Sequence, residues 1–325
     1  MILITGATGF LGRNLCEHLT KQGHQLRALA RPTSDITTLK ALNVEIIFGD
    51  ITDPTAIQQA AQGCDTIIHA AAHFRFWGDS QPFYQTNITG TQHALEAALA
   101  AKVKRFIHIS TIIVVGPKES KVVIREDTPC YPYPTDHYAQ TKFLGEKLAL
   151  SYERKGLPVI ILRLGALYGP HGHYAFNRLF FEEFLRNLRM QVHQGEHLIF
   201  PCYVGGASRA VEAALMQGKP GEIYNISDES IPHREANRIV SRLAQRSSWR
   251  INIPAWLMLG FVQFTEFTSR FTRREPFYPQ KLKPYVFNDW LVDSSKAQVA
   301  LGFVQTSFED GVQQTLDWYR SIGYI

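Results

Sequence analysis

A tyrosine and a lysine four residues apart, Tyr138 and Lys142, are the side chains of this chain best suited to acid–base chemistry. On a helix, residues at this spacing share a face, so both side chains could act on one substrate atom. A phenol titrates near ~10 in water, and a neighbouring ammonium group favours the phenolate, which would make Tyr138 a usable acid or base near neutral pH. Hydride transfer to a carbonyl group needs such a proton donor. The same spacing also arises by chance in surface helices, where the pair would do no chemistry.

Hydroxyl side chains end a predicted strand about 27 residues before the tyrosine. The strand spans Arg105–Thr111 and closes on Ser110 and Thr111. A hydroxyl group at this point could hydrogen-bond the substrate oxygen and help to place it beside the tyrosine. The strand therefore supplies a third candidate for the reaction centre.

The first residues of the chain, 2–15, predict a strand, a tight turn and the opening of a helix, with glycines in the spacing GxxGxxG. A side chain at Gly6 or Gly9 would keep backbone amides away from a pyrophosphate, which in such turns lies at the positive end of the following helix. Gly12 lets the helix pack closely on the strand. The pattern predicts a dinucleotide site in this context, although a plain turn between strand and helix would look similar. The residues expected to contact the cofactor here are Gly6, Thr8, Gly9, Phe10, Leu11 and Gly12.

The end of the second predicted strand, Gln25–Ala30, indicates which dinucleotide is preferred. An Asp or Glu at this point would accept hydrogen bonds from the ribose 2′-hydroxyl of NAD. The chain instead has Arg31, whose guanidinium can pair with a 2′-phosphate. NADP is therefore favoured over NAD, although Asp35 lies close by and Arg31 could be a solvated surface residue. At the adenine end we expect contacts from residues after the third and fourth strands, namely Asp50, Ile51, Ala70, Ala71 and Ala72.

Short β-rich runs alternate with helical patterns over the first 170 residues. The predicted strands are Ile2–Thr5, His24–Ala30, Val44–Asp50, Thr66–Ala72, Arg105–Thr111 and Val159–Gly165, and the predicted helices include Gly12–Lys21, Pro54–Gln62 and Gly90–Ala101. Apolar strands separated by helices indicate a parallel sheet that is buried on both faces. We therefore expect an α/β protein with a doubly wound, Rossmann-type sheet.

After Gly169 the alternation stops, and aromatic and arginine residues become more frequent. This change indicates a second, smaller, mostly C-terminal lobe that binds the substrate. A helical pattern over Ser208–Met216 and a strand pattern over Glu222–Ile226 indicate that the chain returns to the first lobe. We predict a dinucleotide-binding domain made of 1–170 and 203–227, and a substrate-binding lobe made of 171–202 and 228–325.

The bulk composition excludes several classes of protein. The net charge is only +5 and no block of like charge occurs, which argues against nucleic-acid binding. The four cysteines have no ligand-like spacing, so neither a disulfide framework nor a metal site is predicted. Met1 runs straight into an apolar strand without a basic leader, and no apolar run approaches the roughly 20 residues of a membrane span. We expect a cytoplasmic protein.

Several motifs together resemble the extended short-chain dehydrogenases/reductases of the NAD-dependent epimerase/dehydratase superfamily. The motifs are TGATGFLG at 5–12, GDITD at 49–53, NITGT at 87–91, YAQTK at 138–142, RLGALYGP at 163–170, and DSSKA at 293–297 followed by LGF at 301–303. The resemblance covers nearly the whole chain. Within the superfamily, residues 72–77 and 274–276 are similar to the branch of dihydroflavonol reductase-like, 3β-hydroxysteroid dehydrogenase-like and hopanoid-associated epimerase-like proteins.

The resemblance implies a role for each matched residue. Tyr138 would be the acid/base, and Lys142 would bind the nicotinamide ribose and tune the tyrosine, so both would also contact the cofactor. Thr111 stands at the position of the family's catalytic Ser or Thr, counted back from Gly116. Asn87 would support the cofactor side of the site.

The chain also departs from the family pattern near the expected site. Leu164 replaces a proline and Val115 replaces an aromatic residue. Gly205 and Gly206 stand where relatives tend to carry two aspartates that would favour a helix N-terminus. Either Ser208 caps a helix that starts later, or this end is mobile.

The substrate is expected to be a small-molecule carbonyl compound or a sugar. Phe74, Phe76 and Trp77 follow the fourth strand, and a lid over 255–264 could cover them, which favours reduction of an aldehyde or ketone with an apolar or aromatic body. A nucleotide-sugar epimerase or dehydratase is the alternative, with Arg178, Arg186 and Arg189 as a pyrophosphate grip, but their spacing also suits a solvated helix face.

A non-catalytic NADP-binding sensor is a third possibility, but such a protein would not need to keep both Tyr138 and Lys142. The apolar segment Trp256–Phe271 is interpreted as core, lid or dimer contact rather than as a lipid anchor, so a homodimer is possible.

Overall fold

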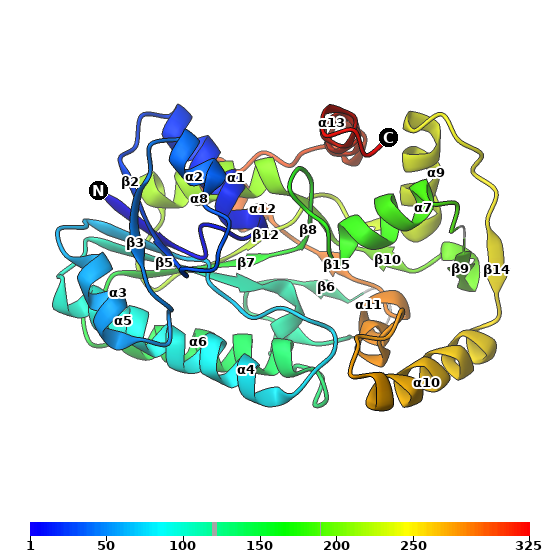
Figure 1. The fold of residues 1–325 in the computed structure, drawn as a ribbon, viewed down its shortest axis with the longest axis horizontal. Coiled ribbons are helices and arrows are strands. Elements are labelled where there is room, and N and C mark those ends of the chain that lie inside the picture. Colours follow the sequence, from blue (N-terminus) through cyan, green and yellow to red (C-terminus); the bar gives the residue numbers. More distant parts are fainter. Residues whose placement is uncertain (119–121, 189) are drawn as a thin grey trace.

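The computed structural model describes residues 1–118, 122–188 and 190–325 of the protein. Its centre is a seven-stranded parallel sheet with the strand order β12-β7-β5-β4-β1-β2-β3 (Figure 1). The strands are β1 (Ile2–Thr5), β2 (Leu26–Ala30), β3 (Glu45–Phe48), β4 (Thr66–His69), β5 (Arg105–Thr111), β7 (Val159–Leu164) and β12 (Ile223–Ile226). The predicted doubly wound α/β fold is confirmed.

Helices cover both faces of the sheet (Figure 1). On one face lie α1 (Phe10–Lys21), α2 (Thr37–Ala41), α8 (Val204–Gln217) and α12 (Ser295–Leu301), and on the other lie α3 (Pro54–Ala61), α5 (Thr91–Ala100) and α6 (His137–Glu153). Helix α1 shows why the layers form, because Leu11, Leu15 and Leu19 recur every four residues and are buried against the strands. The result is two apolar cores, one on each side of the sheet.

The strand order places the expected site. Strand β1 lies between β2 and β4, so the chain winds outward from β1 in both directions. In open parallel sheets, ligands bind at the carboxyl ends of the strands where the winding direction reverses. The turn after β1, the loop after β4 and the end of β5 all lie at this edge.

The second lobe is built from short elements around an aromatic core. Its helices are α7 (Glu183–Leu185), α9 (His233–Leu243), α10 (Ala255–Thr272), α11 (Lys283–Val286) and α13 (Phe308–Ser321). Two-stranded pairs join β6 (Val123–Ile124) to β15 (Leu291–Val292), β8 (Ala166–Tyr168) to β11 (Pro201–Tyr203), β9 (Met190–Val192) to β14 (Ile251–Ile253), and β10 (Leu198–Ile199) to β13 (Ile231–Pro232). Phe180, Phe181, Phe184 and Tyr319 are buried together in the core of this lobe.

The proposed division of the chain into two lobes stays a prediction, but the packing adds one detail to it. Helix α8 and strand β12 belong to the layers of the central sheet. Helix α12 also packs on α8 and β12, although it lies far beyond residue 228. Ala297 and Leu301 of α12 are buried in the same core as α1.

Candidate active site

The glycine turn after β1 has the geometry of a backbone cradle. Gly6 has a φ of +73°, a conformation that favours glycine, and a Cβ at this position would lie 2.7 Å from the amide nitrogen of Ala71. A Cβ on Gly12 would collide with the carbonyl oxygen of Gly6, so only glycine lets α1 approach the strand this closely. Gly9 precedes α1 as its N-cap and has extended backbone. Gly6 and Gly12 are therefore required by the packing of the turn itself.

The N-terminus of α1 is left open for an anion. No side chain caps it and no acidic residue lies in its first turn. By contrast, Asp53 caps α3 and Asp136 caps α6. Free amides at the positive end of a helix, beside a turn without side chains, match the chemistry of a pyrophosphate. The turn therefore fits a dinucleotide.

After β2, Arg31 is exposed, whereas the carboxylate of Asp35 is hydrogen-bonded to other residues. Asp35 accepts a hydrogen bond from Arg13 Nη2 at 2.9 Å and from Thr37 at 2.7 Å, and these contacts lower its pKa. Within the described residues Arg31 makes no ion pair. The guanidinium beside the expected ribose is thus available, while Asp35 is already paired.

The other expected adenine-side residues lie at the neighbouring strand ends. Asp50 Oδ1 accepts hydrogen bonds from the amide and hydroxyl of Thr52, so this carboxylate shapes the turn after β3. Ile51 is buried against Gly90. Ala70 to Ala72 directly follow β4, and Ala71 contacts the turn at Gly6.

Tyr138 lies in the first turn of α6 and packs against an aromatic side chain. Its ring centroid is 4.5 Å from that of Phe74. Burial and the carboxylate of Asp136 raise the pKa of the Tyr138 phenol. The sequence led us to expect a phenol activated toward phenolate, whereas the protein matrix by itself favours the neutral form.

Lys142 lies one turn further along the same helix and is buried. Its Nζ donates a hydrogen bond to the carbonyl oxygen of Ile109 on β5 at 2.5 Å. Burial lowers the pKa of Lys142 to about 8, and the Glu146 carboxylate partly opposes this shift. The hydrogen bond fixes the ammonium group against the strand that carries Thr111.

The two hydroxyls at the end of β5 have different surroundings. Ser110 Oγ donates a hydrogen bond to Glu146 Oε1 at 2.5 Å. Glu146 also forms a buried ion pair with Arg163, so the Ser110 hydroxyl belongs to this buried cluster. Side chains alternate across a strand, so Thr111 projects to the opposite face. Thr111 is the last residue of β5, so it lies at the carboxyl edge of the sheet. Of the two hydroxyls, Thr111 is the better candidate for contact with a substrate oxygen.

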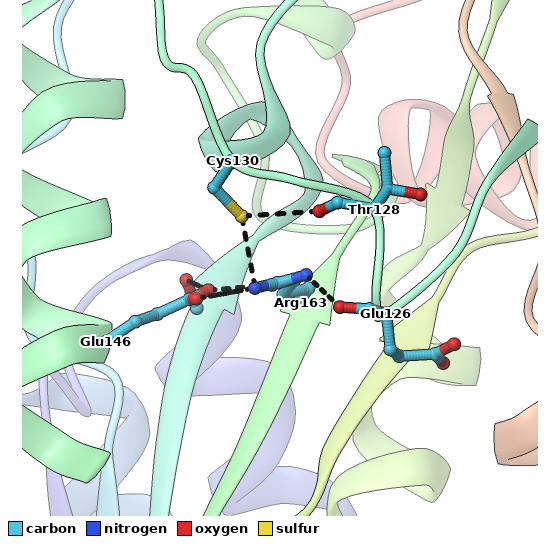
Figure 2. Close-up of polar contacts among 6 residues, drawn as sticks. Glu126, Thr128, Cys130, Glu146 and Arg163 are labelled. Carbon is cyan, nitrogen blue, oxygen red and sulfur yellow. Dashed lines mark hydrogen bonds and ion pairs between the residues drawn. The ribbon is translucent and has the colours of Figure 1, made fainter. Parts of the chain in front are cut away.

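A buried ion pair supports this end of the sheet (Figure 2). Arg163 on β7 binds Glu146 on α6, with its Nη2 2.9 Å from Glu146 Oε2 and both side chains at most 4% exposed. Arg163 also donates to the carbonyl oxygen of Glu126 at 3.0 Å and to the sulfur of Cys130 at 3.3 Å. The pair therefore joins α6, β7 and the loop that precedes Tyr138.

Asn87 acts as a clamp between two parts of the site. It lies in a π-helical turn, Gln85–Gly90, that leads into α5. Its Oδ1 accepts from the amide of His73 at 2.7 Å, while its Nδ2 donates to the His73 carbonyl and to Thr141 Oγ1. Asn87 thus ties the loop after β4 to the helix of Tyr138 and Lys142. Its predicted supporting role is compatible with these contacts.

Asp136 and Tyr285 were not found from the sequence. Asp136 caps α6 by accepting from the amide of Ala139, and it also accepts from the hydroxyl of Tyr285 on α11 at 3.1 Å. This contact joins the helix of Tyr138 to the second lobe. An aspartate directly before a helical pattern is an N-cap signal, so the sequence could have predicted the contact of Asp136 with the start of α6. The partner in α11 lies 149 residues away and left no local signal.

The aromatic residues after β4 do not all face the expected site. Phe76 is buried, stacks on Tyr174 at 5.5 Å and packs edge-on against Tyr285 at 5.3 Å. Its amide nitrogen donates to the hydroxyl of Tyr174, which itself donates to Glu275 at 2.5 Å. Phe74 remains the aromatic side chain in contact with Tyr138. Phe76 therefore supports the wall behind the site.

The expected pyrophosphate grip of the second lobe is largely engaged elsewhere. Arg178 forms an ion pair with Glu183 at 3.2 Å and donates to the carbonyl oxygen of Phe277. Arg186 lies over the ring of Tyr324 at 5.9 Å. Arg189 lies outside the described residues.

The helix that contains Gly205 and Gly206 begins before Ser208, contrary to one of the two sequence alternatives. Helix α8 starts at Val204, so the interpretation that Ser208 caps a later helix is wrong, and Ser208 Oγ instead donates to the Val204 carbonyl inside the helix. A carboxylate from another segment still binds the N-terminus of α8, because Asp228 accepts a hydrogen bond from the amide of the N-cap residue Tyr203 at 2.6 Å. Burial raises the pKa of Asp228 to about 6.

A matching family model decides the class of the protein. The model, described as the NAD dependent epimerase/dehydratase family, covers residues 2–227. The chain belongs to this family. The chain is similar to a putative dihydroflavonol 4-reductase from Synechocystis, which is 28% identical over 99% of this chain and 95% of its own length. Sterol demethylase protein B from Methylococcus capsulatus is 29% identical over 99% of both chains.

Solved structures of the epimerase/dehydratase family share the fold over the whole chain. The UDP-glucuronic acid 4-epimerase from Bacillus cereus in complex with NAD has a TM-score of 0.78, with 27% identity and 99% coverage of both chains. Its resemblance, together with the family match, makes this protein an enzyme of the extended short-chain dehydrogenase type. Within the described residues no cluster of His, Cys, Asp or Glu suited to a metal ion is found.

The shifted pKa of Lys142 predicts a pH limit for cofactor binding. Because the folded-state pKa is about 8, below the ordinary 10.5, the ammonium form is lost as the pH rises through about 8. We expect NADPH affinity to fall above this pH and to be flat below it. Fluorescence titration of NADPH from about pH 6 to about pH 10 measures this profile. Affinity that stays constant to about pH 10 would remove the Lys142 charge from the cofactor site.

Proposed function

We propose that this protein uses NADPH to reduce an aldehyde or ketone with an apolar or aromatic body. The bound cofactor supplies the hydride to the carbonyl carbon. Tyr138 donates the proton to the carbonyl oxygen, and the Thr111 hydroxyl holds that oxygen in place. Lys142 holds the nicotinamide ribose and keeps a positive charge beside the phenol. The glycine turn and the open end of α1 bind the pyrophosphate.

The grouping of Tyr138, Lys142 and Phe74 is the observation that carries this proposal. Tyr138 and Lys142 lie one turn apart on α6, and the Tyr138 ring is 4.5 Å from the ring of Phe74. A protonated phenol can donate to the oxygen of a carbonyl group, and the aromatic ring beside it offers apolar surface to the rest of such a substrate. Burial and Asp136 raise the Tyr138 pKa, in agreement with a role as proton donor.

The surroundings of Tyr138 support an apolar substrate. Its ring lies against Phe74, and Phe74 itself contacts Phe76 and Tyr174 edge-on. Such a wall offers apolar surface with few groups that would bind sugar hydroxyls. The relative named sterol demethylase protein B is also named for an apolar molecule.

A nucleotide-sugar epimerase or dehydratase is the second candidate, favoured by the likeness to the UDP-glucuronic acid 4-epimerase. Its substrate would need a cationic grip for the pyrophosphate. Arg178, however, is already paired with Glu183, whose carboxylate is largely buried. We rank this activity below the reductase for that reason. A non-catalytic sensor ranks third, because Lys142 is held in place by β5 and not left on the surface.

A substrate screen tests the proposal. Purified protein is mixed with NADPH or NADH and with aromatic aldehydes, long-chain ketones, steroid ketones or nucleotide sugars, and cofactor absorbance is followed. We expect NADPH oxidation with an apolar carbonyl compound and none with nucleotide sugars. Epimerisation of a sugar, followed by chromatography, would support the second candidate. NADPH binding without any turnover would support the sensor.

Substitution of Arg31 tests the cofactor preference. In Arg31→Asp the 2′-phosphate loses a charged partner and meets a carboxylate, so NADPH affinity should fall roughly ten- to hundredfold. NADH affinity should change little. The control is Arg154→Asp, because Arg154 is also exposed but lies at the C-terminal end of α6. An unaltered NADPH to NADH affinity ratio in Arg31→Asp would exclude Arg31 from the site.

A further inference from the structure

The outer face of α10 is covered by large apolar side chains that no other part of the described chain covers. The exposed fractions are 74% for Trp256, 49% for Leu257, 46% for Phe261, 65% for Phe264, 57% for Phe267 and 75% for Phe271. Figure 1 shows α10 at the edge of the molecule, on the second lobe. Of the three sequence interpretations of this segment, core, lid or dimer contact, core is therefore wrong for most of its aromatic residues, and lid and dimer contact stay predictions.

The helical geometry makes this face continuous. At about 100° per residue, the six exposed side chains fall within an arc of about 140°. The opposite arc carries Met258 and Val262, which line a cavity of about 130 Å³ between α10 and the rest of the lobe. A helix on the surface of a globular protein normally presents polar residues outward. Helix α10 instead presents large apolar side chains outward, which favours an occupant for its outer face.

Positive charge lies at the C-terminal end of this face. Before the helix, Arg246 and Arg250 pack into the second lobe, where they donate to the carbonyl oxygens of Leu185 and Asn237. Arg273 and Arg274 directly follow the helix and are exposed. The single acid of α10, Glu266, is half-buried, and its charge partly opposes the lowering of the Lys281 pKa by burial. The outer face is thus apolar and is bordered at its C-terminal end by two exposed arginines.

We propose that α10 binds the surface of an anionic lipid membrane, with its aromatic face in the interface and its helix axis parallel to the bilayer. Aromatic side chains on one face and nearby arginines are the features that hold such helices among lipid headgroups. The helix does not cross the bilayer, because within the described residues no helix is long and apolar enough to do so. This placement does not depend on the proposed reductase activity.

A second copy of the chain is a less suitable occupant. A two-fold contact through α10 would leave Arg273 and Arg274 of each copy without an anionic partner on the described part of α10, because its one acid, Glu266, is half-buried. Uncompensated charge at the border of an interface opposes association. Anionic headgroups instead neutralise these arginines and leave the apolar side chains in contact with acyl chains.

The test is flotation of the full-length protein with lipid vesicles. One set contains phosphatidylcholine alone and the other contains phosphatidylcholine with phosphatidylglycerol. We expect binding to the anionic vesicles, at least tenfold weaker in Phe264→Ser/Phe271→Ser and about tenfold weaker in Arg273→Gln/Arg274→Gln. The matched control is Met216→Ser/Val299→Ser, which removes side chains that are 66% and 89% exposed but lie outside α10. This control should bind like the unchanged protein.

The variants also separate lipid binding from loss of folding and from dimerisation. Circular dichroism and thermal unfolding confirm that each variant is folded before its vesicle binding is compared. Absence of binding to both kinds of vesicle would overturn the proposal, as would equal binding of the α10 variants and the control. Sedimentation that shows a dimer abolished by Phe264→Ser/Phe271→Ser, without vesicle binding, would assign the face to a second copy and would also overturn it.

Discussion

Replacement of Tyr138 by phenylalanine is expected to lower kcat roughly a thousandfold and to leave NADPH affinity within about twofold. The variant keeps the ring that packs 4.5 Å from Phe74 and removes only the hydroxyl. The cofactor turn and the Lys142 contact with Ile109 stay as they are. Turnover is followed through NADPH absorbance with the substrate found in the screen, and affinity through NADPH fluorescence.

The matched control for this experiment is Tyr131→Phe. Tyr131 lies seven residues before Tyr138 in the sequence and is 73% exposed, so loss of its hydroxyl should leave kcat unchanged. Equal activity of Tyr138→Phe and Tyr131→Phe would show that another group supplies the proton. A loss of NADPH affinity in Tyr138→Phe as large as the loss of kcat would instead make Tyr138 a binding residue.

Replacement of Arg163 by methionine is expected to lower the free energy of unfolding by about 3–5 kcal/mol. The change leaves the Glu146 carboxylate buried without its cation, beside Ser110. It also removes the hydrogen bonds to the loop at Glu126 and Cys130 that precedes Tyr138 (Figure 2). Urea unfolding followed by circular dichroism measures the loss.

Two further variants define what the ion pair contributes. Arg163→Met/Glu146→Leu removes both charges, so it should recover most of the stability lost in Arg163→Met. Arg242→Met breaks an ion pair with Glu309 in which the side chains are 60% and 51% exposed, so it should cost about 1 kcal/mol or less. If Arg163→Met is no more destabilising than Arg242→Met, the buried pair does not hold α6 to β7.

These two experiments address two points along one helix. Tyr138 lies at the start of α6, and Glu146, two turns later, is paired with Arg163 of the sheet. The helix can present Tyr138 accurately only if its own position is fixed. Asp136 and Asn87 add to this positioning through Tyr285 and Thr141. The precision of the site thus depends on buried polar contacts away from the substrate.

The local sequence was sufficient to predict the central fold. Alternation of apolar strands with helices predicted the parallel sheet, because strands buried on both faces must be apolar throughout. The glycine spacing predicted the turn after β1, because Gly6 and Gly12 meet backbone atoms at distances that no side chain allows. Tyr138 and Lys142 were predicted to share a helix, and α6 contains both. Each of these predictions rests on neighbours in the chain.

Tertiary contacts decided the features that spacing could not indicate. Family resemblance pointed to Thr111 rather than Ser110, and only the tertiary structure shows the contact across 36 residues by which Ser110 binds Glu146. The pKa of Tyr138 is raised by burial and by Asp136, although the lysine four residues away had suggested the opposite direction. The outer face of α10 has the composition of a core, and only the packed lobe shows that nothing in the described chain covers most of it. Burial and long-range partners set protonation and exposure, and both arise only when distant segments pack together.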